Sequence, residues 1–166
     1  MQIEYFYDES TGTLTYVVYD TSSKDAIVID PVLDYEPQSS STATIAVDKI
    51  LSFLRQNRLN VRMIVETHAH ADHLSGAQFI KREYPGAPVT IGEGITRSQK
   101  EFKRVFDLPE SFATDGSQFD RLLKDGETVR VGSLTFEVIA TPGHTPGCSS
   151  YRFGKHVFTG DALFMP

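Results

Sequence analysis

The sequence predicts an α+β fold in which helices cover paired sheets, a layered αββα arrangement. Two observations lead to this fold class: β-favouring segments open and close the chain, and amphipathic helical patterns alternate with strands between them. Hydrophobic residues make up 40% of the chain and charged residues 23%, proportions that are typical of soluble globular proteins. A chain of 166 residues is expected to form a single domain spanning residues 1–166.

The first part of the chain is expected to be an antiparallel meander of strands. Residues 2–7, 13–20 and 25–30 are rich in β-branched and aromatic residues, and polar residues separate these segments. Residues 31–42 then break the pattern with proline, serine and acidic residues, so we expect an irregular connection there.

Three helices are expected from the three- and four-residue spacing of apolar side chains. The first begins at Ala43, with Ser41 or Thr42 as its cap. The second covers residues 75–84 and stops before a Pro-Gly pair, and the third covers residues 96–106. Their core-facing positions are expected to be Ala46, Ile50, Phe53 and Leu54 in the first helix and Phe102, Val105 and Phe106 in the third.

Further strands are expected between and after the helices. One covers residues 61–66 and another residues 88–91, while residues 107–125 have weak periodicity and are predicted to be a long surface loop. The closing strands are expected at residues 134–140, 148–153 and 156–160.

Charge and composition exclude several classes of function. Sixteen basic and 22 acidic side chains give a net charge of −6, and no basic run interrupts the sequence. Nucleic-acid binding and binding to an anionic membrane are therefore not expected, because both need clustered Lys and Arg. The single Cys148 excludes an internal disulfide and is expected to be a small buried hydrophobe. Because no targeting or membrane-spanning segment is visible, the cytoplasm is the expected location.

The segment THAHADH, residues 67–73, is the strongest indication of a functional site. It holds three of the chain's five histidines and follows the apolar strand that precedes it. Because alternate side chains of an extended chain point to the same side, His68 and His70 can aim at one cation. Asp72 and His73 follow after the chain begins to turn, and are expected to form a second cluster beside the first.

Two later segments each offer one more ligand. In TPGHTPG, residues 141–147, a Pro-Gly pair on each side of His144 holds the imidazole on a short, stiff loop. Asp161 follows Gly160 at the end of an apolar run, where a carboxylate is costly to desolvate unless a cation meets it. His156 lies within a predicted strand and is interpreted as structural.

The motifs HxHxDH, Gly-His-Thr-Pro-Gly and Thr-Gly-Asp, in this order, resemble the signature of the metallo-β-lactamase superfamily. The wording of THAHADHLSGA, ATPGHTPGCSSY and FTGDALF is most similar to the persulfide dioxygenase branch, that of the ethylmalonic encephalopathy protein, with glyoxalase II as its neighbour. The resemblance implies an αββα sandwich with a metal site at one edge.

The resemblance also implies a reaction. In persulfide dioxygenases one Fe(II) is held by residues that match His68, His144 and Asp161, and glutathione persulfide is oxidised with O2 to sulfite and glutathione. His70, Asp72 and His73 would then orient the ligands. Two histidines and one carboxylate on one face of iron leave positions open for O2 and the persulfide sulfur. The resemblance leaves open whether the protein forms a homodimer. Some relatives are mitochondrial.

Two alternatives remain open. In a dinuclear zinc hydrolase of thioesters, one ion would take His68, His70 and His144. The second ion would take Asp72 and His73, with Asp161 bridging the two ions. In the other alternative the chain is a metal-binding module without turnover.

The chain is expected to be the N-terminal part of a longer domain, incomplete at its C-terminus. Its last residues, ALFMP, are apolar, whereas natural chain ends are usually polar. A further histidine of dinuclear members and the glutathione-holding residues of the dioxygenases would lie beyond Pro166.

Overall fold

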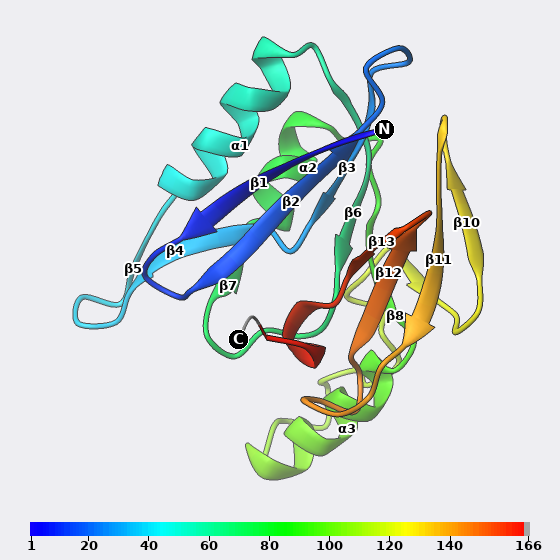
Figure 1. The fold of residues 1–166 in the computed structure, drawn as a ribbon. Helices are drawn as coiled ribbons and strands as arrows, with labels where there is room; N and C mark the ends of the chain where they lie inside the picture. Colours follow the sequence, from blue (N-terminus) through cyan, green and yellow to red (C-terminus); the bar gives the residue numbers. More distant parts are fainter. Residues whose placement is uncertain (165–166) are drawn as a thin grey trace. The chain divides into compact units, whose positions relative to one another are not determined.

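The computed structural model describes residues 1–164, which form three α-helices and thirteen strands (Figure 1). The predicted α+β class is therefore confirmed. The chain divides into two compact units. The first unit comprises Met1–Val65, His70–Val89 and Val131–Leu134, and the second comprises Glu66–Ala69, Thr90–Arg130 and Thr135–Pro166.

The first unit contains the predicted meander. Strand β1 pairs antiparallel with β2, and β2 pairs antiparallel with β3. Strand β3 then pairs parallel with β6, and helix α1 lies on the long connection that such a parallel pair requires. The bounds are β1 (Gln2–Asp8), β2 (Thr13–Tyr19), β3 (Asp25–Ile29), α1 (Ile45–Gln56) and β6 (Asn60–Glu66).

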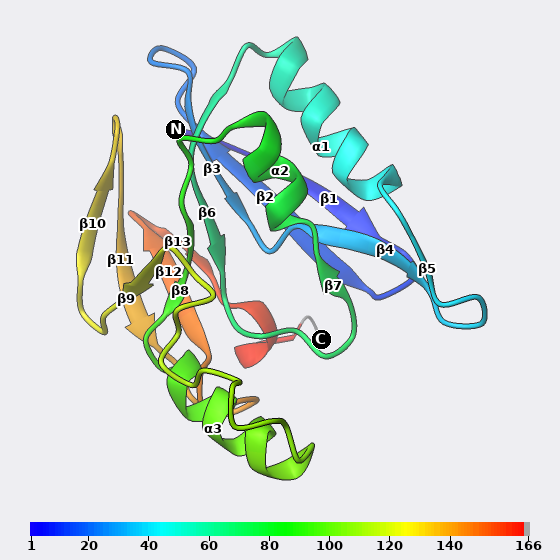
Figure 2. The same ribbon diagram turned by 180° about the vertical axis from the view of Figure 1, so that it is seen from behind.

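Helices α1 and α2 (Ala77–Glu83) lie over the strands of this unit, as seen from behind (Figure 2). The buried stripe of α1 consists of Val47, Ile50, Leu51 and Leu54. Two predicted core positions are thus right, whereas Ala46 and Phe53 are only half-buried. The helix also begins later than predicted, at Ile45 instead of Ala43, after Thr44, whose side chain makes no capping bond to the helix backbone. Among the residues that the structure describes, no helix is long and apolar enough to cross a membrane.

A small sheet replaces the irregular connection predicted for residues 31–42. Strand β4 (Val32–Glu36) pairs antiparallel with β5 (Ser41–Ala43) on one edge and with β7 (Leu74–Ser75) on the other. The prediction was wrong here because β5 and β7 are three and two residues long. Segments this short carry no periodicity, so their pairing is visible only in three dimensions.

The second unit contains two groups of strands. Strand β8 (Val89–Gly92) pairs parallel with β9 (Arg121–Leu123) through Thr90, Ile91 and Gly92. A four-stranded sheet has the order β10-β11-β12-β13, in which β11 and β12, and β12 and β13, pair antiparallel. The bounds are β10 (Thr128–Val131), β11 (Leu134–Ala140), β12 (Ser149–Phe153) and β13 (His156–Phe158).

Aromatic side chains fill the core of that sheet. Phe136 stacks on Phe153, with ring centroids 4.9 Å apart, and meets Tyr151 edge to face. Phe153 also meets Phe158 edge to face. The four side chains are nearly inaccessible to solvent, so they fix the strands that carry the later motifs.

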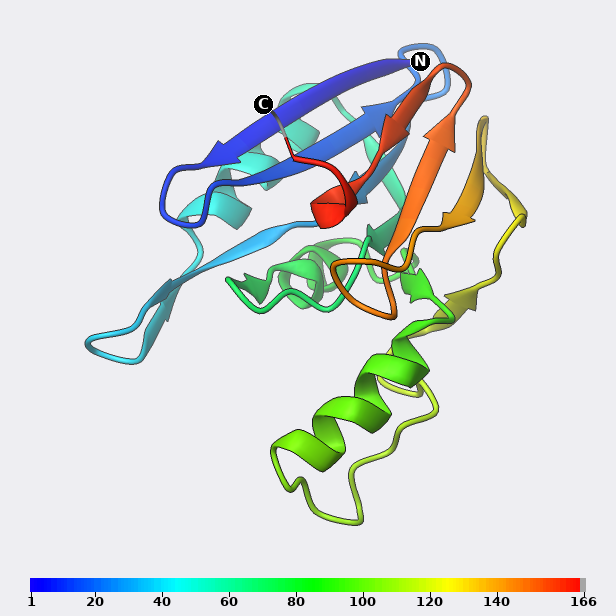
Figure 3. The same cartoon turned by 60° about the horizontal axis from the view of Figure 1, so that its bottom comes forward.

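Helix α3 (Ile95–Val105) exposes the residues that were predicted to face the core. Ile95, Ser98 and Gln99 are buried, whereas Phe102, Val105 and Phe106 are 37%, 59% and 65% exposed. Only the first half of this helix face is buried, and the segment that follows the helix turns back alongside it (Figure 3). The predicted loop 107–125 is also partly wrong, since it contains β9.

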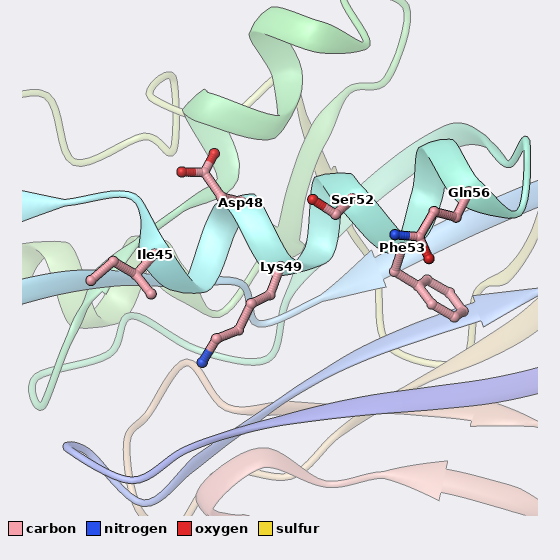
Figure 4. A pocket seen from close by; sticks show the side chains of 6 residues that line it. All are labelled: Ile45, Asp48, Lys49, Ser52, Phe53 and Gln56. Atoms are coloured by element: carbon pink, nitrogen blue, oxygen red, sulfur yellow. The ribbon is translucent and has the colours of Figure 1, made fainter.

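A surface hollow of about 520 Å³ lies on α1 (Figure 4). The side chains that line it all come from this one helix, and none is a candidate ligand; they are Ile45, Asp48, Lys49, Ser52, Phe53 and Gln56. We assign this hollow no function.

A buried carboxylate anchors one corner of the first unit. Asp25 accepts a hydrogen bond from Nε of Arg62 at 2.7 Å and another from the backbone N–H of Ser133 at 2.9 Å. The bond from Arg62 lowers the pKa of Asp25 against the opposing effect of burial. Gly132 has a φ of +59°, and a β-carbon there would lie 2.3 Å from Oδ2 of Asp25. Glycine is therefore required both by the backbone and by the carboxylate.

We predict that Gly132→Ala destabilises the protein more than Gly154→Ala does. Both glycines have φ near +60°, so an alanine at either position incurs left-handed strain of about 1–2 kcal/mol. Gly154 faces open space, whereas Gly132→Ala also displaces a charged hydrogen-bond acceptor, which adds about 1.5–3 kcal/mol. Denaturant unfolding of the two variants measures the difference, and equal losses would contradict this account of Asp25.

Candidate metal centre

Three of the predicted ligands come together in the second unit. His68 follows the end of β6, His144 lies in the loop between β11 and β12, and Asp161 lies in a short 3₁₀ turn, η1 (Gly160–Ala162), after β13. One ligand atom from each lies within 4.8 Å of the other two. Segments remote in sequence thus deliver two imidazoles and one carboxylate to one place.

The distances fit a shared cation. Nε2 of His144 lies 3.5 Å from Oδ2 of Asp161, and Nε2 of His68 lies 3.9 Å from the same oxygen. A metal that bonds two such atoms at about 2.1 Å holds them roughly 3.0–3.4 Å apart at octahedral or tetrahedral angles. The imidazole planes of His68 and His144 are nearly perpendicular, at 86°, with ring centroids 5.1 Å apart. Small side-chain shifts would therefore bring all three atoms to bonding distance.

The segment that carries His68 is fixed by strand β12. The backbone N–H of Ser149 donates to the carbonyl of Thr67 at 2.9 Å, and the hydroxyl of Tyr151 donates to the carbonyl of Glu66 at 2.7 Å. Oγ1 of Thr67 lies 3.0 Å from Nδ1 of His68, whose side chain is 1% exposed. With the Nδ1 proton on this bond, Nε2 keeps its lone pair and faces Asp161.

Gly160 allows the Asp161 turn to approach His68. Its φ is +48°, and a β-carbon there would lie 2.2 Å from Oγ1 of Thr67. Any side chain would displace the same hydroxyl that contacts the His68 ring. The Thr-Gly-Asp motif therefore needs glycine at this position, because two ligand-bearing segments are in close contact there.

The His144 loop is closed by its own residues. Sγ of Cys148 accepts from the backbone N–H of Thr145 at 3.2 Å, and the N–H of Thr141 donates to the carbonyl of Cys148 at 3.0 Å. Cys148 is buried, as predicted. Gly147 packs closely against the start of α3, since a β-carbon at Gly147 would lie 3.2 Å from backbone atoms of Gly94. The stiff loop expected from the two Pro-Gly pairs is thus packed on one side.

A second cluster lies in the first unit. Candidate ligand atoms of His70, Asp72 and His73 lie within 4.8 Å of one another, and the two imidazole rings are tilted at 30° with centroids 4.1 Å apart. Nδ1 of His70 lies 4.0 Å from Oδ1 of Asp72. Nε2 of His70 lies 3.1 Å from a carboxylate oxygen of the buried Asp30, which fixes the ring and leaves Nδ1 on the side of the cluster.

The surroundings of His73 favour its neutral imidazole, the form that binds metals. Its Nδ1 lies 2.9 Å from the carbonyl oxygen of Leu74, so Nδ1 carries the proton. Burial, and then the nearby His70, lower the pKa of His73 below its usual value. Its Nε2 is buried and has no hydrogen-bond partner within residues 1–164. A cation would satisfy this lone pair, which fits the residues to a metal.

Asp72 has an ionised carboxylate that is 44% exposed. Partial desolvation alone would raise the pKa of Asp72. Hydrogen bonds from its own backbone N–H and from the hydroxyl of Thr13, together with the nearby His73 and His70, outweigh that effect and lower the pKa. Asp72 can therefore supply negative charge to a cation at neutral pH.

The six predicted ligands thus fall into two groups, one in each unit, and their binding of metal stays a prediction. His156 is exposed at the start of β13 and belongs to neither group. Sequence reasoning missed Asp30, although the same signal that marked Asp161, a carboxylate at the end of an apolar strand, was present there. It also missed Thr13, for which the sequence offers no signal.

Comparison with known proteins places the chain in a family. The model of the metallo-beta-lactamase superfamily matches residues 10–166. The chain is 44% identical to Glyoxylase B2 of Dictyostelium discoideum, over 99% of this chain and 57% of that protein. It is 30% identical to the human mitochondrial persulfide dioxygenase ETHE1, over 92% of this chain and 49% of that protein.

A solved structure gives the same result for the fold. The crystal structure of ETHE1 from Myxococcus xanthus superimposes with a TM-score of 0.74 at 30% identity, covering 99% of this chain and 59% of that one. The chain thus spans about half to three fifths of the length of these relatives. Members of this superfamily bind metal ions, which agrees with the two His/Asp groups. The chain belongs to the metallo-β-lactamase superfamily.

Proposed function

We propose that the chain forms the metal-binding part of a mononuclear Fe(II) persulfide dioxygenase, which oxidises glutathione persulfide with O2 to sulfite and glutathione. The observation that carries the proposal is the group of His68, His144 and Asp161, whose ligand atoms lie within 4.8 Å of one another. Two imidazoles and one carboxylate form the facial donor set of non-haem Fe(II) oxygenases. Similarity to the human persulfide dioxygenase ETHE1, and to the structure of ETHE1 from Myxococcus xanthus, supports the same reaction class.

Held by His68, His144 and Asp161, an iron ion would supply the one-electron chemistry that ground-state O2 needs. In the overall reaction, O2 takes up the electrons that the outer sulfur loses. Water supplies the remaining oxygen of sulfite, and the inner sulfur leaves as the thiol of glutathione.

The three ligands differ in how far they are exposed to solvent. His68 is buried and fixed through Thr67, so it defines the inner side of the centre. The side chains of His144 and Asp161 are 39% and 32% exposed, so they lie at the solvent side, where small substrates can arrive. The carboxylate of Asp161 offsets part of the charge of a divalent cation, which lowers the cost of holding that cation beside buried groups.

A dinuclear zinc hydrolase of thioesters is the second candidate. The specific observation in its favour is the His70, Asp72 and His73 group, which offers ligands for another ion. The higher identity to Glyoxylase B2 points in the same direction. In that enzyme the cations would lower the pKa of a water that attacks the thioester carbonyl.

Metal content and oxygen uptake distinguish the candidates. We predict that the chain, loaded anaerobically with Fe(II), retains about one iron per chain and consumes O2 when glutathione persulfide is added, with sulfite as a product. The measurement combines metal analysis with an oxygen electrode and sulfite detection. The zinc-loaded chain is the control and is expected to consume no O2, since zinc has no redox chemistry.

Cleavage of a glutathione thioester by the zinc-loaded chain, with no oxygen uptake by the iron-loaded chain, would replace the dioxygenase with the hydrolase. Bound iron with neither activity would leave a metal-binding module. Both results would contradict the proposal.

Substitution of single histidines tests the assignment to one ion. We predict that His144→Ala abolishes iron retention, because it removes one of three ligands, whereas His73→Ala retains iron and only lowers the rate of oxygen uptake. His156→Ala is the matched control, since His156 is exposed and outside both groups. Iron content after gel filtration measures retention, and equal loss from His144→Ala and His73→Ala would count against a mononuclear site.

A further inference from the structure

We propose that Thr13 is a positioning residue for Asp72, so that the turn between β1 and β2 controls the His70, Asp72 and His73 group. The inference rests on the proposed function in one respect, namely that this group takes part in cation binding, either by bonding a cation or by orienting the ligands of one. All the residues involved belong to the first unit.

The contact joins residues that are 59 positions apart in sequence. Oγ1 of Thr13 donates a hydrogen bond to Oδ2 of Asp72 at 3.1 Å. The other carboxylate oxygen, Oδ1, lies on the side of His70, 4.0 Å from its Nδ1. The threonine hydroxyl thus occupies one oxygen of Asp72 and leaves the other on the side of His70.

Asp72 needs such a partner because its side chain is 44% exposed. A carboxylate at a half-exposed position can rotate between several orientations, and holding it in one of them has an entropic cost at the moment of cation binding. His70 and His73 are fixed by Asp30 and by the carbonyl of Leu74. The hydroxyl of Thr13 is the corresponding side-chain contact for the third member of the group.

The turn that carries Thr13 is itself closed by hydrogen bonds. Oδ2 of Asp8 accepts from the backbone N–H of Thr11 at 3.0 Å, and the N–H of Gly12 donates to the carbonyl of Asp8 at 2.9 Å. Gly12 has a φ of +72°, which this turn requires. Thr13, the first residue of β2, is therefore presented to Asp72 by a short and well-defined hairpin, the blue strand pair of Figure 1.

The hydroxyl protons further define the direction of the contact. Oγ1 of Thr11 lies 2.9 Å from Oγ1 of Thr13 and 2.8 Å from Oδ2 of Asp8. Each hydroxyl has one proton, and an ionised carboxylate can only accept. When the proton of Thr13 is donated to Asp72, that of Thr11 serves either Thr13 or Asp8. Each threonine hydroxyl then donates its one proton, and the series of contacts ends at the carboxylate of Asp72.

Cobalt binding to the metal-free protein tests the proposal without relying on any reaction. Co(II) is titrated into the wild-type chain and into Thr13→Val, Thr13→Ser, Asp72→Asn and the double variant, and the absorption of bound Co(II) gives the affinities. Thr13→Val, which keeps the shape and removes the hydroxyl, is expected to weaken Co(II) binding by roughly tenfold. Thr13→Ser, which keeps the hydroxyl, is expected to restore the affinity to within about twofold of wild type.

The double variant identifies the path of the effect. If Thr13 acts through Asp72, Thr13→Val causes no further loss when Asp72→Asn is already present. Thr42→Val, a substitution at an exposed threonine of β5, is the matched control and is expected to leave Co(II) binding unchanged.

Additive losses in the double variant, or wild-type affinity in Thr13→Val, would overturn the proposal. Wild-type affinity in Asp72→Asn would overturn it as well, because Asp72 would then have no role for Thr13 to support. Failure of the dioxygenase proposal is recognised separately, as absence of oxygen uptake by the iron-loaded wild-type chain.

Discussion

Two imidazoles and a carboxylate can share a cation at low cost only if the protein holds them together before the cation arrives. In this chain the constraint is met by close contact between ligand-bearing backbone segments. Gly160 lies against Thr67, where no β-carbon would fit, and Thr67 contacts the ring of His68. Gly147 also lies close to the start of α3, since a β-carbon there would lie 2.8 Å from Oγ of Ser98 and 3.2 Å from backbone atoms of Gly94. The positions of the ligands therefore depend on close packing of the backbone at these two glycines.

This dependence explains what the sequence could predict. The ligands were visible because HxHxDH, a histidine between two Pro-Gly pairs and an aspartate after Thr-Gly are rare arrangements with few structural roles. The α+β class and the long strands were visible because β1, β2, β3 and β6 are β-favouring segments of five to seven residues that polar residues or helical patterns separate. The burial of Cys148 also followed from residue type.

The remaining features depend on contacts between distant residues. Strands β5 and β7 are too short to show a pattern, and they exist because β4 offers each of them an edge. The apolar face of α3 was predicted correctly as a face but not as an exposed one, since periodicity does not say how far a helix extends past its support. The bond between Thr13 and Asp72 joins positions that no local pattern connects.

The two ligand groups differ in how they are held. His68, His144 and Asp161 are placed by strand ends and tight turns, whereas the side chains of His70 and Asp72 contact the side chains of Asp30 and Thr13. The first group is therefore supported by the backbone, as expected if it holds the proposed iron.

The most direct test of this account is a crystal structure of the iron-loaded chain with anomalous scattering recorded at the iron edge. The account predicts one iron bonded to Nε2 of His68, Nε2 of His144 and a carboxylate oxygen of Asp161, at about 2.0–2.2 Å each. Iron bonded only by His70, Asp72 and His73 would contradict it. A structure in which His68, His144 and Asp161 remain too far apart to share an ion would also contradict it.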